Sequence, residues 1–406
     1  MYRISRSLLL FSCLSVTPWI CHVGSSSSSS SSSSFSKQIV HDYPYVPSIS
    51  GGIRILPHAH PPRTYIDETH SPHTTYVLGS CSKSMTALAI VKQFHEMNQS
   101  VHRPVKEMFN KTYIHPSYAN VHLNDLLCMS GGINDGYFLN NISYWKSILQ
   151  HSTLKEQRAQ LTKQVLSTQA AYPPGTSYLY SNMGYVIAAH IAEYLFHTTY
   201  EDMMTTYVFT PLGLHHARVP LMNVTTNNNN NTAIGHAIVV HDDEETNYWY
   251  HWYHMMNNTL HFPRARTYPT PAVPDGKTYV VPTDLQYPLP VMSAAALVRI
   301  NMGDWLHYLH TVMVQNTSYL PTNTWNMLLH TGVHMDRGSM YSYGWTYHIH
   351  TPDILTYCGF IFTFSAHVTI HQHQHYAIAS MTNYGDAQMC PSTPMIQLER
   401  DLTTLI

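Results

Sequence analysis

Four stretches of the chain have apolar residues at helical spacing. In the first, which follows Ser80, every third residue is apolar until about Asn98. Another stripe follows Asn182, a third covers 295–313, and a fourth lies at the C-terminus, where Pro394 suits a first helical turn. This spacing places the apolar side chains on one helix face, so we expect four amphipathic helices.

Four other stretches are rich in β-branched and aromatic residues and predict strands. They cover 52–56, 341–350, 361–370 and 376–381. The order is a strand, a long helix, a mixed helical middle, then strands and a final helix. This order predicts an α/β (α+β) fold with an antiparallel sheet built from both chain ends and flanked by helices. A mostly helical subdomain is expected as an insertion over about 115–290.

The first 37 residues have a different pattern. Arg3 and Arg6 precede a short apolar stretch, which is typical of a signal peptide and shorter than a bilayer span. We expect a signal peptide over 1–24, with an uncleaved signal anchor as the alternative. The unbroken serine run that follows cannot bury apolar surface and predicts a Ser-rich linker over 25–37. One folded domain would then cover 38–406.

The chain is polar through uncharged and titratable side chains more than through permanent charge. It has 30 His and 30 Tyr but only 21 Lys and Arg, and its formal net charge is −2. With 11% charged residues, its electrostatics do not favour nucleic acid or an anionic membrane as partner. After the N-terminal segment no stretch has 18 consecutive apolar residues, so no membrane association is expected once the signal peptide is cleaved. The sequence does not predict an oligomeric state.

Asn-x-Ser/Thr triplets agree with secretion and predict a secreted glycoprotein. They begin at Asn98, Asn110, Asn141, Asn223, Asn230, Asn257 and Asn316. Outside the signal region the cysteines are Cys81, Cys128, Cys358 and Cys390. Four cysteines permit three pairings, and their spacing matches no zinc pattern, so the pairing stays open.

The strongest chemical pattern is Ser80-x-x-Lys83 at the predicted start of a helix. Residues i and i+3 share a helix face, so the Lys83 amine can reach the Ser80 hydroxyl. The helix N-terminus favours negative charge on the serine oxygen, and burial lowers the pKa of a lysine until it can accept a proton. We therefore expect Ser80 to be a nucleophile and Lys83 its base.

The segment around Ser80 resembles the first motif of the β-lactamase and penicillin-binding-protein superfamily. The likeness is greatest to its class C β-lactamase, D-alanyl-D-alanine carboxypeptidase and esterase branch. A second match is Tyr180-Ser181-Asn182, about one hundred residues later, preceded by Pro-Gly and followed by a predicted helix. It resembles the Tyr-x-Asn motif of that branch. The resemblance implies that Tyr180 shares proton transfer with Lys83 and that Asn182 holds a substrate carbonyl or amide.

Smaller landmarks fall in the family's order. The stretch 126–133 resembles its Leu-Leu-Thr-His-Thr-Ser-Gly-Leu segment, with substitutions that include Met129 and Gly131. Residues 211–214 resemble its Pro-Leu-Gly-Met turn. The resemblance covers about 79–406 and implies a β-lactamase/transpeptidase-like fold.

The third motif departs from the family. The family carries Lys-Thr-Gly or His-x-Gly on an edge strand of the cleft, and the best counterpart is Tyr357-Cys358-Gly359, followed by Phe360. By the family's geometry, the backbone N–H groups of Phe360 and Ser80 would form the oxyanion hole. A phenol, with a pKa of about 10, can donate a hydrogen bond but cannot neutralise a substrate carboxylate. Carboxypeptidase and penicillinase activities are therefore not expected.

Two minor patterns allow alternatives. If the motifs are placed correctly, Cys81 and Cys358 lie near the cleft, either as a disulfide or as two unpaired buried thiols. The alternating residues His367, His371, His373 and His375 could share a strand face and hold a metal. An exposed hairpin in a His-rich chain is the interpretation we favour, and we expect no metal or organic cofactor.

These residues predict a serine hydrolase that forms an acyl-enzyme at Ser80 and releases it to water. The expected substrate is a small ester or amide, contacted by Asn182, Tyr357, Gly359 and Phe360. Two other functions stay open. One is a β-lactamase-like binding protein impaired in catalysis, and the other is a structural secreted glycoprotein with no ligand.

Overall fold

The computed structural model describes residues 34–56, 62–66, 70–109, 111–139, 141–221, 232–233, 235–240, 278–282, 289–361, 363–385 and 390–406. The predicted signal peptide and the serine run up to Ser33 lie outside these residues. So do Asn110, Asn223, Asn230 and Asn257 of the predicted glycosylation sites.

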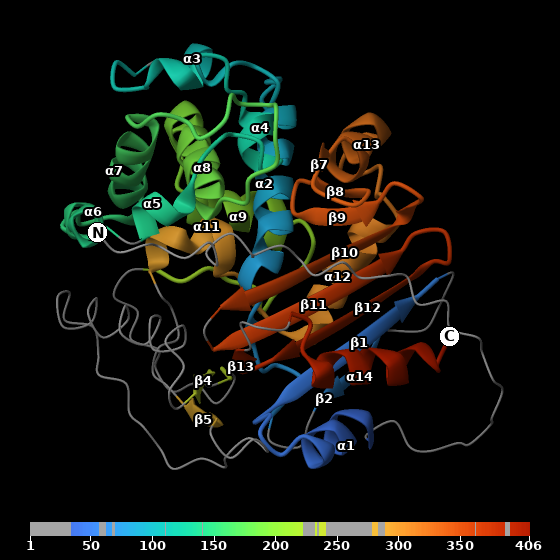
Figure 1. Ribbon diagram of the computed structural model, residues 1–406. Coiled ribbons are helices and arrows are strands. Elements are labelled where there is room, and N and C mark those ends of the chain that lie inside the picture. The colour runs from blue at the N-terminus through green and yellow to red at the C-terminus, as the bar shows by residue number, and fades with distance from the viewer. Residues whose placement is uncertain are drawn as a thin grey trace.

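An eight-stranded antiparallel sheet forms one half of the structure (Figure 1). In spatial order its strands are β2 (Arg63–Ile66), β1 (Ile49–Ile55), β12 (Tyr376–Thr382), β11 (Phe364–His371), β10 (Thr351–Ile361), β9 (Trp345–His348), β8 (Ser339–Ser342) and β7 (Val333–His334). β1 is inserted between β2 and β12, with Ile49 opposite Thr382. Both ends of the chain therefore build one sheet, which confirms the predicted fold class.

The helices and the short elements complete the architecture. The helices are α1 (Ser34–Asp42), α2 (Ser82–Glu96), α3 (Val105–Met108), α4 (Leu123–Leu127), α5 (Asp135–Leu139), α6 (Ile142–Leu149), α7 (Leu154–Leu166), α8 (Asn182–Phe196), α9 (Tyr200–Met204), α11 (Ser293–Ala296), α12 (Met302–Met313), α13 (Thr322–His330) and α14 (Thr393–Thr403). Single turns are η2 (Gly79–Cys81), η3 (Pro116–Tyr118), η4 (Thr205–Phe209) and η5 (Pro290–Met292), and the short strands are β3 (Tyr76–Val77), β4 (His236–Val240), β5 (Thr278–Pro282), β6 (Arg299–Ile300) and β13 (Tyr384–Gly385).

Two glycines of β1 let helices pack directly on both faces of the sheet. A Cβ atom at Gly51 would lie 2.7 Å from Leu398 of α14, and one at Gly52 would lie 2.5 Å from Leu306 of α12. Successive residues of a strand point to opposite faces. The sheet is therefore a middle layer between α12 on one side and α14, with α1, on the other (Figure 1).

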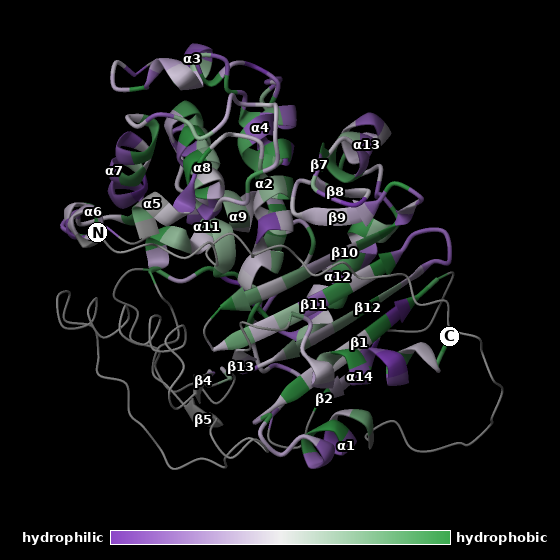
Figure 2. Ribbon diagram, in the orientation of Figure 1, coloured by the Kyte–Doolittle hydropathy of each residue, from purple (hydrophilic) through white to green (hydrophobic). Residues whose placement is uncertain are grey.

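The other half of the structure is a helical lobe formed by α2 to α9 and α11 (Figure 1). Helix α8 is apolar along most of its length (Figure 2), and its residues 183–193 are all buried. Helix α2 packs against it, carries Lys83 in its first turn and is preceded by the turn η2, which holds Ser80. The interval predicted as mostly helical, 115–290, also contains β4 and β5, which form a small sheet with β13.

The prediction of one helix over 295–313 is wrong for the residues before Met302. Residues 299–300 form β6, which pairs with β3, and the helix begins at Met302. Asn301 is the N-cap, and its Oδ1 accepts a hydrogen bond from the Asp304 N–H at 2.8 Å. An N-cap satisfies the free N–H groups of a first turn, so this polar residue starts the helix inside a continuous apolar pattern.

Two strand predictions also need correction. The stretch 341–350 is a hairpin of β8 and β9, because Tyr343 and Gly344 turn the chain with φ of 47° and 94°. The strand β10 was not predicted over 351–360, where Pro352 and Asp353 weaken the pattern. It lies inside the sheet between β9 and β11, although the family resemblance implied an edge strand.

The end of the predicted linker is also helical. Residues 34–37 form the first turn of α1, where the Ser36 hydroxyl donates to the Tyr65 carbonyl at 2.9 Å and Phe35 packs on the Tyr65 ring. An apolar residue after the serine run therefore anchors the chain to β2. None of the helices in the described ranges is long and apolar enough to cross a membrane.

Candidate active site

Ser80 lies where a tight turn enters a helix. It is the middle residue of η2, directly before α2, and Gly79 precedes it with φ of 53°. A Cβ atom at Gly79 would lie 2.5 Å from the backbone nitrogen of Phe360, and one at Gly359 would lie 2.9 Å from that of Ser80. Two glycines therefore bring the backbone of β10 against the backbone that carries Ser80. Strand β9 pairs with β10 only as far as Thr356. Past that point, the remaining residues of β10, 357–361, lie against η2 in place of a neighbouring strand.

Lys83 is the centre of the polar contacts at this site. Its side chain is fully buried, and its Nζ lies 3.0 Å from Ser80 Oγ and 2.8 Å from the Tyr180 hydroxyl. The same Nζ lies 2.8 Å from Asn182 Oδ1 and 2.8 Å from the carbonyl oxygen of Ala295. The Tyr180 and Ser80 hydroxyl oxygens are 2.6 Å apart. The structure thus brings together the residues of the first two predicted motifs.

Burial changes the protonation of the lysine. Loss of water around Lys83 lowers its pKa to about 7, because the charged ammonium is poorly solvated there. The negative charge of Asp135 acts in the opposite direction and raises this pKa. Near neutral pH, a large fraction of Lys83 is therefore a neutral amine that can accept a proton.

Tyr180 and Asn182 are held by the loop that starts α8. The Leu179 N–H donates to the Met129 carbonyl at 2.7 Å, and the Gly175 N–H donates to the Ser130 carbonyl at 2.8 Å. Ser181 is the N-cap of α8, and its hydroxyl accepts from the Gly184 N–H at 2.9 Å. The second motif is therefore fixed both by a helix cap and by the stretch 126–133 that the resemblance singled out.

Asp135 is a part of this site that the sequence analysis missed. It begins α5, is 8% exposed, and one carboxylate oxygen accepts from the Ser181 hydroxyl at 2.6 Å. The other oxygen accepts from the Asn182 N–H at 2.5 Å. The available signal was its position, directly after the stretch 126–133. The carbonyl of Ala295 had no such signal, because a backbone oxygen does not depend on residue type.

The third motif is close to Ser80, but its tyrosine is buried. Tyr357 is 4% exposed, and its ring packs on Tyr341 with centroids 5.7 Å apart. The Tyr341 hydroxyl lies 3.1 Å from that of Tyr185, which donates to the Leu127 carbonyl at 2.8 Å. Burial raises the pKa of Tyr185 and Tyr341 well above the usual range. Tyr357 therefore belongs to a group of buried tyrosines, of which Tyr185 and Tyr341 are neutral at ordinary pH.

The structure settles the cysteine pairing. Cys358 forms a disulfide with Cys390, whereas Cys81 and Cys128 are buried thiols outside this disulfide. The alternative disulfide between Cys81 and Cys358 is therefore wrong. The bond ties β10, the strand of the third motif, to the segment that enters α14, so this strand has a covalent anchor.

The histidines form separate contacts. His367 lies 2.9 Å from both carboxylate oxygens of Glu399 on α14, while His373 and His375 are exposed in the turn between β11 and β12. In the part of the chain that the structure describes, no three His, Cys, Asp or Glu side chains are grouped so that they could hold a metal ion.

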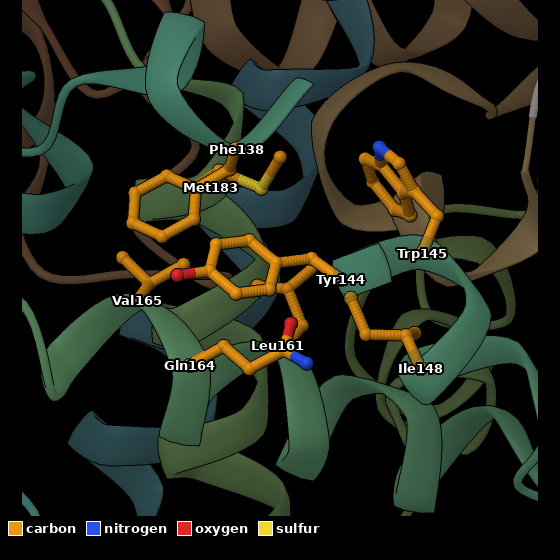
Figure 3. Close-up of a pocket in the computed structure, with 8 residues that line it drawn as sticks. All are labelled: Phe138, Tyr144, Trp145, Ile148, Leu161, Gln164, Val165 and Met183. Carbon is orange, nitrogen blue, oxygen red and sulfur yellow. The ribbon is translucent and has the colours of Figure 1, made fainter. Parts of the chain in front are cut away.

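A small apolar pocket lies behind the second motif, between α5, α6, α7 and α8 (Figure 3). It is lined by Phe138, Tyr144, Trp145, Ile148, Leu161, Gln164, Val165 and Met183. Met183 follows Asn182 directly, and Phe138 lies on the same short helix as Asp135. This pocket therefore belongs to the packing that supports the site, and it contains none of the predicted catalytic side chains.

Comparison with known proteins identifies the family and the fold of the chain. The beta-lactamase family model matches residues 64–389. No curated relative matches the chain by sequence. Among solved structures, D-amino acid amidase from Ochrobactrum anthropi SV3 in complex with L-phenylalanine is similar, with a TM-score of 0.65, 15% identity and coverage of 92% of this chain and 97% of that one.

Two further structures have the same fold. A penicillin-binding protein from Bacillus halodurans superposes with a TM-score of 0.64 and 15% identity, covering 91% of this chain and 99% of that one. D-alanine carboxypeptidase AmpC from Burkholderia cenocepacia has a TM-score of 0.62 and 14% identity, covering 91% and 96%. At such low identity, these likenesses establish the fold alone.

Proposed function

Because the chain belongs to the beta-lactamase family, we propose that it is a serine hydrolase that forms an acyl-enzyme at Ser80. One observation carries the proposal. The Ser80 hydroxyl, the Lys83 amine and the Tyr180 hydroxyl lie within 3.0 Å of one another, inside a largely buried site. A serine hydroxyl becomes a useful nucleophile when a base of suitable pKa is within hydrogen-bonding reach.

The contacts of Lys83 orient its lone pair. The oxygens of Asn182 and Ala295 are carbonyl oxygens and can only accept hydrogen bonds. A neutral amine has two N–H groups, and these two acceptors engage both. Its lone pair is then left for the hydroxyls of Ser80 and Tyr180. Lys83 is therefore arranged to accept the Ser80 proton as the Ser80 oxygen attacks the substrate carbonyl.

Tyr180 can carry a proton between the base Lys83 and the leaving group of the substrate. Its hydroxyl lies 2.6 Å from Ser80 Oγ and 2.8 Å from Lys83 Nζ, so a proton can pass between all three atoms. In the proposed cycle, the proton taken from Ser80 is returned to the leaving alcohol or amine. Water then attacks the acyl-enzyme with the same groups acting as base, and the acid product leaves.

The backbone of β10 supplies the proposed oxyanion hole. The close approach of the Gly359 backbone to that of Ser80 supports the Ser80 and Phe360 N–H groups as the two donors that the family resemblance implies. Fixed N–H donors stabilise the negative oxygen that forms in acyl transfer, and each contributes about 3 to 4 kcal/mol to the transition state.

The substrate proposed for this site is a small neutral ester or amide. The third motif offers a buried tyrosine, which cannot balance a substrate carboxylate as a lysine would. The side-chain carbonyl oxygen of Asn182 already accepts a hydrogen bond from Lys83, and its amide nitrogen would be the contact for a substrate carbonyl.

A labelling experiment tests the nucleophile. The purified protein is treated with a fluorophosphonate probe, in which a serine oxygen displaces fluoride, and with a chromogenic short-chain ester. Wild type should label and turn over, and Ser80→Ala should do neither. Ser84→Ala is the matched control, because Ser84 lies in the first turn of the following helix α2 and hydrogen-bonds to the Cys81 carbonyl and to Tyr308.

Each outcome has a clear meaning. Labelling that survives in Ser80→Ala would show that another residue is the nucleophile. A folded wild-type protein that neither labels nor hydrolyses the ester would favour a binding protein impaired in catalysis.

We also propose that the protein is secreted and glycosylated. Asn98 and Asn316 lie in Asn-x-Ser/Thr triplets and are exposed, and the Cys358–Cys390 disulfide fits an oxidising compartment. Protein expressed in a eukaryotic secretory host should lose mass on treatment with a peptide N-glycosidase. An unchanged mass would refute the glycosylation.

A further inference from the structure

Asp135 is a buried carboxylate whose hydrogen bonds all lead to the second motif. Its two oxygens accept from the Ser181 hydroxyl at 2.6 Å, the Asn182 N–H at 2.5 Å and the Met183 N–H at 3.3 Å. A buried ionised group is costly unless it is paired and hydrogen-bonded. Here the partners are two backbone N–H groups of the first turn of α8 and the helix N-cap side chain, which suit a negative charge.

These contacts fix the residues on both sides of Ser181. Tyr180 and Asn182 are its chain neighbours, and both touch Lys83. A shift of Ser181 would move both contacts together. The carboxylate therefore holds the geometry of the proposed proton relay without touching the substrate.

The same carboxylate acts on Lys83 through its charge. The groups that face Lys83 come from several elements. Ser80 and Cys81 lie in η2, Tyr180 lies in the loop before α8, Tyr185 lies on α8, and Asp135 lies on α5. Asp135 is the carboxylate in this set. Burial raises the pKa of Asp135, and its hydrogen bonds and the charge of Lys83 lower it. The two buried groups are therefore coupled.

We propose that Asp135 is a positioning residue of the acyl-transfer site, which anchors Tyr180 and Asn182 and balances the charge of Lys83. This inference rests on the proposed function, because it assumes that Lys83 activates Ser80. It assigns two separable effects to one side chain. The hydrogen bonds set the maximal rate, and the charge sets the pH at which Lys83 becomes neutral.

The test measures the rate of fluorophosphonate labelling of the full chain between pH 5 and 9. In Asp135→Asn, the amide keeps nearly the same shape but loses the charge. The midpoint of the pH profile should move to lower pH by about 0.5 to 1, because a cationic Lys83 is no longer favoured by a nearby anion. The plateau should fall about tenfold, because the amide nitrogen cannot accept from an N–H group.

Ser181→Ala is the second variant and separates the two effects. It removes the 2.6 Å contact and the helix cap but keeps the charge of Asp135. Its plateau should fall while its pH midpoint stays at the wild-type value. If Asp135→Asn does not fold, this variant decides alone, and an unchanged plateau would overturn the proposal.

A merely structural role gives a different result. Asp135→Asn would then lower the melting temperature and leave the midpoint and the plateau unchanged, which would overturn the inference. Failure of the proposed function is recognised separately, because wild type itself would then not be labelled at any pH.

Discussion

The contact between Gly359 and the Ser80 backbone allows a sharp test of the proposed oxyanion strand. In Gly359→Ala the new Cβ atom would lie 2.0 Å from the Leu78 carbonyl oxygen and 2.9 Å from the Ser80 nitrogen. Ordinary van der Waals contact begins at 3.4 Å, so β10 or η2 has to move by about 1.4 Å, the difference between 3.4 and 2.0 Å. Both neighbours are backbone atoms, which cannot rotate away as a side chain can.

A displacement of this size is large for an oxyanion hole. Its donors have to lie about 2.7 to 3.1 Å from the developing negative oxygen, so a shift of more than 1 Å removes one of them. Loss of one donor costs about 2.7 to 4 kcal/mol, which corresponds to about 10²- to 10³-fold in kcat. We therefore expect Gly359→Ala to reduce kcat for a chromogenic ester by this factor.

The assay needs a control for methyl addition. In Gly303→Ala the new atom would lie 3.8 Å from Asn301 Oδ1, an ordinary contact within α12, and activity should not change. Thermal unfolding of both variants shows how much of each is folded at the assay temperature. A folded Gly359→Ala protein with wild-type kcat would refute the role given to this strand.

Four further predictions follow from contacts in the structure. Labelling of Ser80 by a fluorophosphonate should rise about tenfold per pH unit at acidic pH and level off above a midpoint near 7, because Lys83 is a base only when neutral and burial lowers its pKa to about 7. Lys83→Arg, a permanent cation, should lose about 10²- to 10⁴-fold in rate at pH 8, and a rate unchanged from wild type would contradict the assignment. Replacing Cys358 and Cys390 by serine opens a crosslink with a sequence separation of 32 and should lower the free energy of unfolding by about 3 to 4 kcal/mol in urea titrations, whereas an unchanged midpoint would contradict this. Arg158→Met leaves Glu193 buried without its 2.6 Å ion pair and should cost about 3 to 5 kcal/mol, and a loss below about 1 kcal/mol in the same titration would show that Glu193 finds another partner.

The sequence predicts the Ser80–Lys83 pair because its geometry is local, whereas the meeting of Tyr180 and Asn182 with that pair was implied by the family resemblance. Ser80 and Lys83 share a helix face through their spacing, and Tyr180 and Asn182 flank a helix cap. Helix starts and helix faces are set by nearby residues, so their positions follow from the pattern. The antiparallel sheet was predicted for a related reason, since the β-branched stretches fall at both chain ends.

Features that depend on contacts between distant segments were not predicted. The pairing of Cys358 with Cys390 requires the start of α14 to lie beside β10, and four cysteines carry no information on that proximity. The helix start at Met302 depends on the pairing of β6 with β3, which an apolar pattern does not reveal. Asp135 was missed because an acidic residue after a loop usually faces water, whereas here the fold buries it.

The position of β1 has a consequence for how the protein is made. β1 has β12 as its neighbour on one side, and the hydrogen bond from the Thr382 hydroxyl to the Ser48 carbonyl joins residues 334 apart in sequence. During synthesis, the apolar residues Ile49 and Ile53 therefore emerge long before their partner strand exists. Contacts of such separation form slowly, and an unpaired apolar strand is prone to aggregate. The sheet is therefore complete only after residues 376–382 have been synthesised, and until then the first strand is an exposed apolar segment.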